Sequence, residues 1–170
     1  LEGEAIGYST ILGNSKGNRI HMGGGGGTAN QSPSLGLSAS AGGSGGGIFI
    51  IITDTLEISG SRTISASGAS VTDIFNAGAG GGGGGGVIVI DVNTYAGNQV
   101  TLKVNGGKGG SVSGTPYKTG PGGGGGGGVV QYNGASLNPT FVSVNRDGGE
   151  SGFIDGSDDA NGAFDGKPGA

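Results

Sequence analysis

Hydrophobic residues gather in short runs, and each run directly follows a stretch of glycine. The three junctions are Gly45–Gly47 into Ile48–Ile52, Gly80–Gly86 into Val87–Ile90, and Gly122–Gly128 into Val129–Tyr132. Isoleucine and valine are branched at Cβ and prefer an extended backbone, so each run predicts a β-strand. Because apolar residues occupy consecutive positions, we expect these strands to be covered on both faces.

A second kind of segment, with alternating hydrophobic and polar residues, accompanies these strands. The four segments with this pattern are Arg19–Met22, Thr63–Ala66, Thr101–Val104 and Phe141–Val144. A period of two predicts a strand with one covered face. Turn-forming residues such as Ser59-Gly60-Ser61 lie between the two kinds of strand. We expect a β-hairpin in each unit. The alternative is a parallel solenoid, in which equivalent strands stack on one another.

The whole pattern recurs about every 40 residues, since the first strands begin at 48, 87 and 129. It divides a single glycine-rich domain, 1–170, into four units near 1–47, 48–86, 87–128 and 129–170. Glycine-free windows are rich in β-branched residues, which are poor helix formers. The predicted fold class is therefore all-β without an α-helix, with polyglycine-II helices in the glycine runs.

Glycine supplies 47 of the 170 residues, and this composition requires an unusual source of stability. Ordering glycine costs more backbone entropy than ordering any other residue, and glycine has no side chain to bury. Its N–H and C=O groups must therefore bond to neighbouring backbones. A polyglycine-II-like helix, with three residues per turn, directs these groups sideways. Any side chain would hold the neighbours apart, so we expect Gly83 and Gly125 to be framework positions.

Long glycine runs that alternate with dissimilar loops resemble the polyglycine-II sandwich of T-even-type phage tail-fibre tip adhesins. Springtail antifreeze proteins are similar in kind. The segments that carry the resemblance are Gly23–Gly27, Gly42–Gly47, Gly80–Gly86, Gly106–Gly110 and Gly122–Gly128. The resemblance implies stacked glycine helices that support variable loops, and these loops would recognise a bacterial surface.

Charge and composition exclude several classes of function. The net charge is −4, and no lysine or arginine cluster exceeds a single residue, so we expect no nucleic-acid partner. No apolar run approaches the roughly 18 residues of a membrane span, so we expect no membrane insertion. Cysteine is absent, His21 is the only histidine, and no nucleophile elbow or phosphate-binding loop occurs. We therefore expect neither enzymatic catalysis nor a bound cofactor.

The most acidic stretch leaves two interpretations open. Asp155, Ser157, Asp159 and Asn161 place oxygen atoms at alternate positions, and Asp165 follows. Hard cations such as Ca²⁺ prefer oxygen ligands, which would make the stretch a calcium loop. However, Ala160 occupies the position where an EF-hand requires glycine, and Gly166 stands where it requires glutamate. The other interpretation is a solvated acidic loop.

The loops between glycine runs differ from unit to unit and carry apolar side chains. The candidate interface or recognition residues are Val71, Ile74, Phe75, Tyr117, Phe153, Ile154 and Phe164. Exposed aromatic residues are typical of interfaces. These side chains would contact another subunit or a receptor, or else they would cover the glycine layer.

These observations together predict an extracellular or cell-surface structural protein, of bacterial origin, that assembles into a filament, fibre or sheath. The first unit begins at a strand without a glycine run before it, and the last unit ends where a further glycine run is due. Because the two ends are complementary, we expect a head-to-tail homopolymer. The chain starts at Leu1 without methionine or a signal-like segment, which indicates a processed product or a fragment. The alternative is an adhesin whose loops bind a cell-surface receptor or glycan.

Overall fold

The computed structural model describes the chain except for residues 1–19, 31–37, 115–118, 135 and 155–161. The described residues form strands and extended segments and contain no helix, which confirms the all-β prediction. The strands are β1 (Ile48–Ile58), β2 (Arg62–Ser65), β3 (Ile74–Phe75), β4 (Val87–Gly97), β5 (Val100–Lys103), β6 (Val112–Ser113), β7 (Val129–Gly134) and β8 (Val142–Asn145).

All strand pairs are parallel, and they form three small sheets. The orders are β1-β4-β7, β2-β5-β8 and β3-β6. Ile48 pairs with Val87, and Val87 pairs in turn with Val129. Because β1 and β2 belong to different sheets, the predicted hairpin is wrong. Equivalent strands stack on one another instead, as in the alternative interpretation.

Packing of apolar faces explains why the hairpin does not form. Ile88, Ile90 and Val92 of β4 form one buried cluster with Val100 and Leu102 of β5. Consecutive strands such as β4 and β5 thus pack face to face through their side chains. Their hydrogen bonds go to other strands, since β1 bonds to β4 and β2 bonds to β5. The turn at 59–61 carries the chain from one sheet to the other.

The first four residues of β4, Val87–Ile90, are buried on both faces, as their consecutive apolar side chains predict. The same prediction is wrong for β1, an edge strand whose Ile48, Phe49, Ile50 and Ile52 are exposed. On the face of β4 away from β5, Val87 and Val89 join Val129 in a second buried cluster, and Ala170 packs against it. β1 and β4 are also longer than predicted, because the parallel ladder continues through polar residues to Ile58 and Gly97. A hydrogen bond of 3.1 Å from Asn93 Nδ2 to Asp54 Oδ1 joins the two strands in this polar part.

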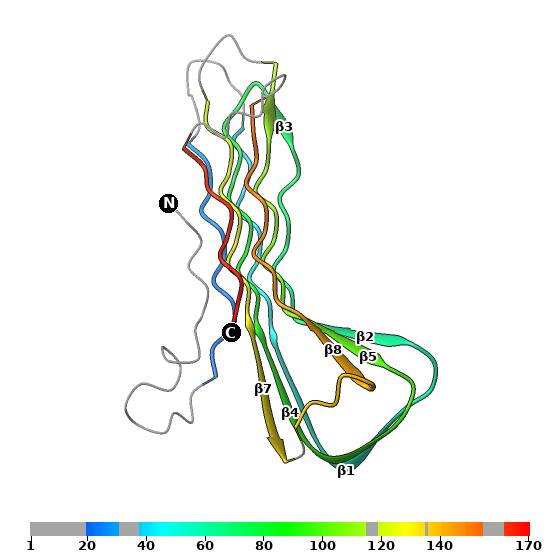
Figure 1. The fold of residues 1–170 in the computed structure, drawn as a ribbon. Coiled ribbons are helices and arrows are strands. Elements are labelled where there is room, and N and C mark those ends of the chain that lie inside the picture. The colour runs from blue at the N-terminus through cyan, green and yellow to red at the C-terminus, as the bar shows by residue number, and fades with distance from the viewer. Residues whose placement is uncertain (1–19, 31–37, 115–118, 135, 155–161) are drawn as a thin grey trace.

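The molecule is elongated, with the two larger sheets at one end and the loops at the other (Figure 1). Between the two ends run the glycine segments, side by side. β3 and β6 pair at the loop end. The segment 20–22 is not a strand, so the prediction of a strand at Arg19–Met22 is wrong for these three residues, and Arg19 lies outside the described residues.

Tyr95 of β4 packs against the core between the sheets. Burial raises the pKa of its hydroxyl above the ordinary value of 10.0, because desolvation disfavours the phenolate. The hydroxyl oxygen is buried and has no hydrogen-bond partner. Leaving such a group unpaired costs stability, so this position is a weak point of the sheet end.

Candidate interaction surfaces

The run 80–86 is bonded to its neighbours with a period of three residues. Its donors and their acceptors are Gly81 to Gly27, Gly84 to Gly24, Gly82 to Gly123, Gly85 to Gly126, Gly83 to Ala69 and Gly86 to Ala66. The N···O distances are 2.7 to 3.0 Å. Three successive residues therefore donate in three different directions. Two further segments, 42–47 and 104–110, donate to carbonyl groups of the run.

Backbones approach so closely in this region that a side chain has no room. A Cβ atom on Gly83 would lie closer than 3.0 Å to the carbonyl oxygen of Ser44. A Cβ on Gly125 would meet the carbonyl oxygen of Gly83 in the same way. Real Cβ atoms essentially never show such distances, and here the obstacle is backbone instead of a flexible side chain. These two positions are thus closed to every other residue unless the backbones move apart.

The glycine segments form layers. We call the four parallel segments 42–47, 80–86, 122–128 and 163–169 the central layer; the first three lead into β1, β4 and β7. Adjacent members are joined by bonds such as Gly43 to Gly81 and Gly124 to Phe164. The two faces of this layer are covered to different extents.

One face of the central layer is covered along its whole width. The segments 66–71, 104–110 and 146–152 each lie between two members of the layer and bond to them. On the outside of this cover, side chains accept hydrogen bonds from the N–H groups of the next segment. Ser67 Oγ accepts from the Asn105 N–H at 3.1 Å, and Ser70 Oγ accepts from the Lys108 N–H at 3.0 Å. We call this the covered face.

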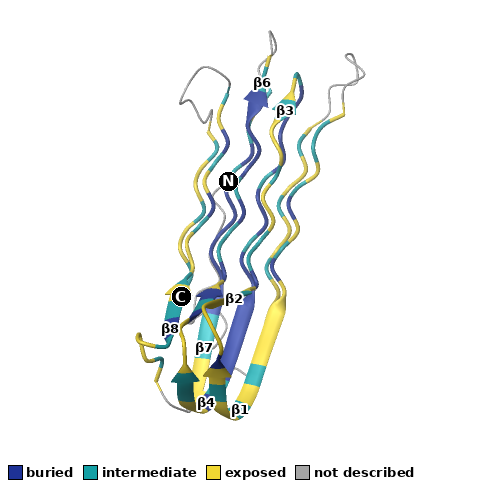
Figure 2. Ribbon diagram, turned by 90° about the vertical axis from the view of Figure 1, so that its right-hand side faces the viewer, coloured by how far each residue is buried: buried dark blue, intermediate teal, exposed yellow. Residues whose placement is uncertain are grey.

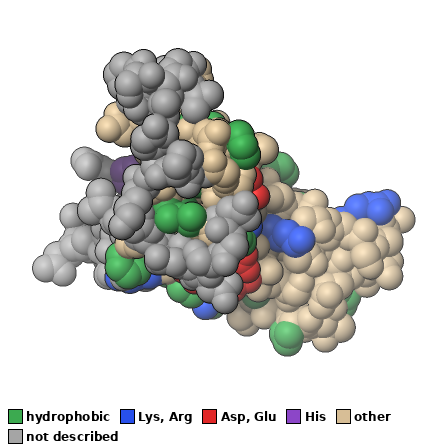
Figure 3. Space-filling view, turned by 90° about the horizontal axis from the view of Figure 1, so that it is seen from above, with side chains coloured by type: hydrophobic (Ala, Val, Ile, Leu, Met, Phe, Trp, Pro, Cys, Tyr) green, Lys and Arg blue, Asp and Glu red, His purple; other side chains and the backbone are tan. Residues whose placement is uncertain are grey.

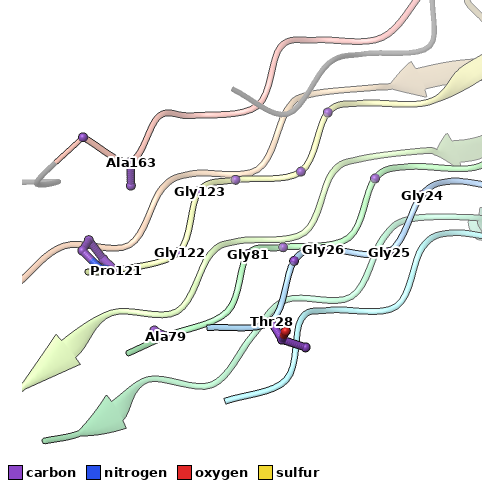
Figure 4. A pocket seen from close by; sticks show the side chains of 17 residues that line it. Gly24, Gly25, Gly26, Thr28, Ala79, Gly81, Pro121, Gly122, Gly123 and Ala163 are labelled. Carbon is purple, nitrogen blue, oxygen red and sulfur yellow. The ribbon is translucent and has the colours of Figure 1, made fainter. Parts of the chain in front are cut away.

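The opposite face, which we call the open face, carries only one segment among the described residues. This is 23–27, which runs antiparallel between 42–47 and 80–86. Gly23 and Gly26 donate to Gly46 and Gly43, and Gly84 and Gly81 donate to Gly24 and Gly27. The next position along this face, between 80–86 and 122–128, is a groove of about 510 Å³. It is lined mainly by bare glycine backbone, with Thr28, Ala79, Pro121 and Ala163 toward one end (Figure 4).

Several backbone groups along this groove have no partner among the residues that the structure describes. Within this part of the chain, the carbonyl groups of Gly82 and Gly85 accept no hydrogen bond, and the N–H groups of Gly123 and Gly126 donate none. Three of these residues line the groove, and Gly85 follows at its end. Gly82, Gly85 and Gly126 are buried, so their unpaired groups are also poorly placed to bond to bulk water.

The outer edge of β1 is a second unpaired surface. Among the described strands, β1 pairs only with β4, and its residues Ile48, Phe49, Ile50 and Ile52 are exposed. Figure 2 shows β1 exposed along most of its length and the neighbouring β4 buried. Ile52 is 76% exposed, although it belongs to an 11-residue strand. Neither this edge nor the groove was among the predicted interaction residues.

The structure places most of the predicted recognition residues at the loop end. Ile74 pairs in parallel with Val112, which bridges to Ile154, so these residues form a short apolar ladder. Phe75 and Phe153 are exposed, and Lys108 Nζ lies 5.2 Å from the Phe153 ring centre. Seen from this end, the visible hydrophobic side chains form several separate groups (Figure 3).

The remaining predicted residues are more dispersed. Val71 is partly buried at the end of the segment 66–71, and Phe164 is exposed at the start of the segment 163–169. Tyr117 lies outside the described residues, and so do residues 155–161, which make up most of the acidic stretch. Among the residues that the structure describes, no group of three or more His, Asp or Glu could hold a metal ion. His21 is exposed.

Comparison with known proteins found no match among family models, curated proteins or solved structures. In the described part of the chain, no helix is long and apolar enough to cross a membrane.

Proposed function

We propose that this chain is an extracellular, self-assembling structural protein, the subunit of a filament, fibre or sheath. Its four units would stack through glycine segments in the polyglycine-II conformation. The three-residue period of the hydrogen bonds of 80–86 supports this conformation, because polyglycine-II has three residues per turn. Such a framework needs no cofactor and little apolar core.

The observation that carries the proposal is the unprotected edge of β1. Soluble proteins shield their edge strands with charges, prolines or bulges, since an open edge pairs with other chains. Here the edge is long and displays isoleucine and phenylalanine. The carbonyl groups of Gly42 and Gly45, which precede β1, also accept no hydrogen bond from any residue that the structure describes. Together they form a continuous edge that a second copy could extend.

Growth through this edge would be head-to-tail. The stack of parallel segments has 42–47 at one edge and 163–169 at the other. These two edges are different, so a contact between them is heterologous and generates an open array. Each added copy would extend the ladder by its own stack of parallel segments.

Electron microscopy and sedimentation velocity of the purified protein test this proposal. We expect polymers with a repeat of one subunit. The double variant Ile50→Lys/Ile52→Lys should remain unassembled, because lysine blocks edge pairing. Phe75→Lys is the matched control, since it introduces the same charge at an exposed position far from β1. A wild-type protein that stays monomeric at high concentration, or a double variant that polymerises equally well, contradicts the proposal.

A second candidate function is an adhesin that presents its loops to a cell-surface receptor or glycan. The observation in its favour is that Phe75 and Phe153 are both exposed at the loop end. An adhesin would form discrete particles that bind cells, and Phe75→Lys would abolish the binding. The same variant thus separates the two candidates.

A further inference from the structure

We infer that the groove on the open face binds a run of glycine supplied by another polypeptide chain. The ligand would lie extended along the groove, antiparallel to 80–86 and 122–128. This contact is separate from the β1 edge, so the groove can bind a glycine run whether or not the chain forms the proposed filament.

The first argument is that the neighbouring groove shows what such a ligand looks like. By the strand register, Gly82 and Gly85 correspond to Gly43 and Gly46, and Gly123 and Gly126 correspond to Gly81 and Gly84. The earlier set of four residues bonds to 23–27 through two carbonyl and two N–H groups. The later set offers the same two carbonyl and two N–H groups, at the same spacing, and none of the four bonds to a described residue. The groove thus has the chemistry of a site that is filled elsewhere in the molecule.

The second argument is that several glycines around the groove are not required by the packing of the chain itself. A Cβ on Gly24 or Gly27 would meet nothing within 4 Å. A Cβ on Gly84 would meet its nearest atom at 3.4 Å, which is ordinary contact. Framework positions such as Gly83 have no such space. Glycine at the open positions is explained if another backbone packs closely there.

The third argument comes from the covered face. There, outward N–H groups are satisfied by side chains such as Ser67 and Ser70, which also keep other backbones at a distance. The open face has no such side chains beside Gly123 and Gly126. The four neutral backbone groups of this groove would select a ligand that can form hydrogen bonds with them. The close approach that these bonds require would also select a ligand without side chains. A glycine run fulfils both conditions.

Titration by NMR tests the inference. The probe is a capped peptide with the sequence of residues 22–28, and the matched control peptide carries alanine in place of its five glycines. The protein carries Ile50→Lys/Ile52→Lys so that it stays unassembled. Four backbone hydrogen bonds correspond to a dissociation constant of about 1 mM, which NMR detects. We expect the amide resonances of Gly123 and Gly126 to shift with the glycine peptide and not with the alanine peptide.

Two protein variants complete the test. Gly84→Val places a side chain in the groove and should abolish the shifts, with Gly81→Val as a second blocking variant. Gly120→Val adds the same side chain where a Cβ meets nothing within 4 Å, outside the groove, and should bind normally. The inference is overturned if about 5 mM glycine peptide, several times the expected dissociation constant, leaves both amides unmoved. Equal binding of the alanine peptide, or unchanged binding to both blocked variants, also overturns it.

The unassembled Ile50→Lys/Ile52→Lys protein, measured without peptide, then identifies one natural source of the glycine run. If the Gly123 and Gly126 resonances shift with protein concentration alone, the run comes from a second copy of this chain. If they shift only with added peptide, another polypeptide supplies it. Both results agree with the inference and differ in the partner.

Discussion

The glycine layers and the sheet end are held together by different forces. The sheet end has a conventional apolar core in which Ile88, Ile90 and Leu102 are fully buried. The glycine layers have almost no side chains, and their cohesion comes from backbone hydrogen bonds in several directions. A side-chain core tolerates some changes of size, because neighbouring side chains can move. Packed backbones cannot adjust in this way, so the two regions should respond very differently to the loss or gain of a few atoms.

The largest expected effect is that of the smallest added side chain in the glycine layers. Gly83→Ala forces the backbone of 42–47 away from 80–86. We expect a loss of about 4 kcal/mol or more, which exceeds the 1–3 kcal/mol typical of an overpacked core. Urea unfolding followed by circular dichroism measures it. Gly120→Ala is the control and should change stability little. Equal stabilities of the two variants would show that the layers are not closely packed.

The core of the sheet end should be sensitive to removal of atoms. Leu102→Ala deletes a fully buried side chain, and we expect a loss of about 2–5 kcal/mol from lost burial and the remaining cavity. Lys103→Ala, at the neighbouring exposed position, should cost less than about 0.5 kcal/mol. Chemical denaturation of both variants gives the comparison. A Leu102→Ala protein as stable as the wild type would show that this core contributes little.

A smaller effect is expected where a side chain completes the backbone hydrogen bonding. Asp73 Oδ1 accepts a bond of 2.8 Å from the N–H of Ser111, which is buried. Asp73→Ala leaves this donor unpaired and should cost about 1–3 kcal/mol. Asp73→Asn keeps an acceptor oxygen and should recover most of the loss. If asparagine behaved like alanine, the carboxylate charge and not the hydrogen bond would be responsible.

The smallest effect concerns Tyr95, and it depends on pH. Because the folded-state pKa lies above 10.0, the folded protein retains a proton that the unfolded chain loses. The contribution of this group is fully present below pH 10 and is lost as the pH rises through the folded-state pKa. Thermal unfolding between about pH 9 and 11 should show this decline. Tyr95→Phe should remove its contribution to the decline and, by deleting an unpaired hydroxyl, raise stability by up to about 1 kcal/mol. An unchanged pH profile in the variant would contradict this account.

Local pattern was sufficient to predict the main strands. The β-branched runs at Ile48, Val87 and Val129 all begin strands, and the predicted turn at 59–61 separates β1 from β2. The pairing was not predictable in the same way. A hairpin and a parallel stack both satisfy the alternation of residues within one unit, and only the packing of β4 on β5 distinguishes them. The two-residue strands β3 and β6 are too short to leave a pattern.

The position of 23–27 was also beyond prediction. Its place in the sequence is equivalent to that of 66–71, yet it lies on the opposite face of the central layer. Glycine runs carry no side chain that could distinguish the two faces, and both faces offer the same carbonyl and N–H groups. The open groove follows from that placement. Glycines with free space at Cβ, such as Gly24 and Gly27, become visible only in three dimensions.

The lack of side chains in the glycine layers has a consequence for the resistance of the protein to proteases. Many proteases select their cleavage sites by inserting a substrate side chain into a specificity pocket. The runs 23–27, 80–86 and 122–128 consist of glycine alone and offer no side chain to such a pocket. Digestion should therefore begin in the loops, and the framework would be the last part to be degraded.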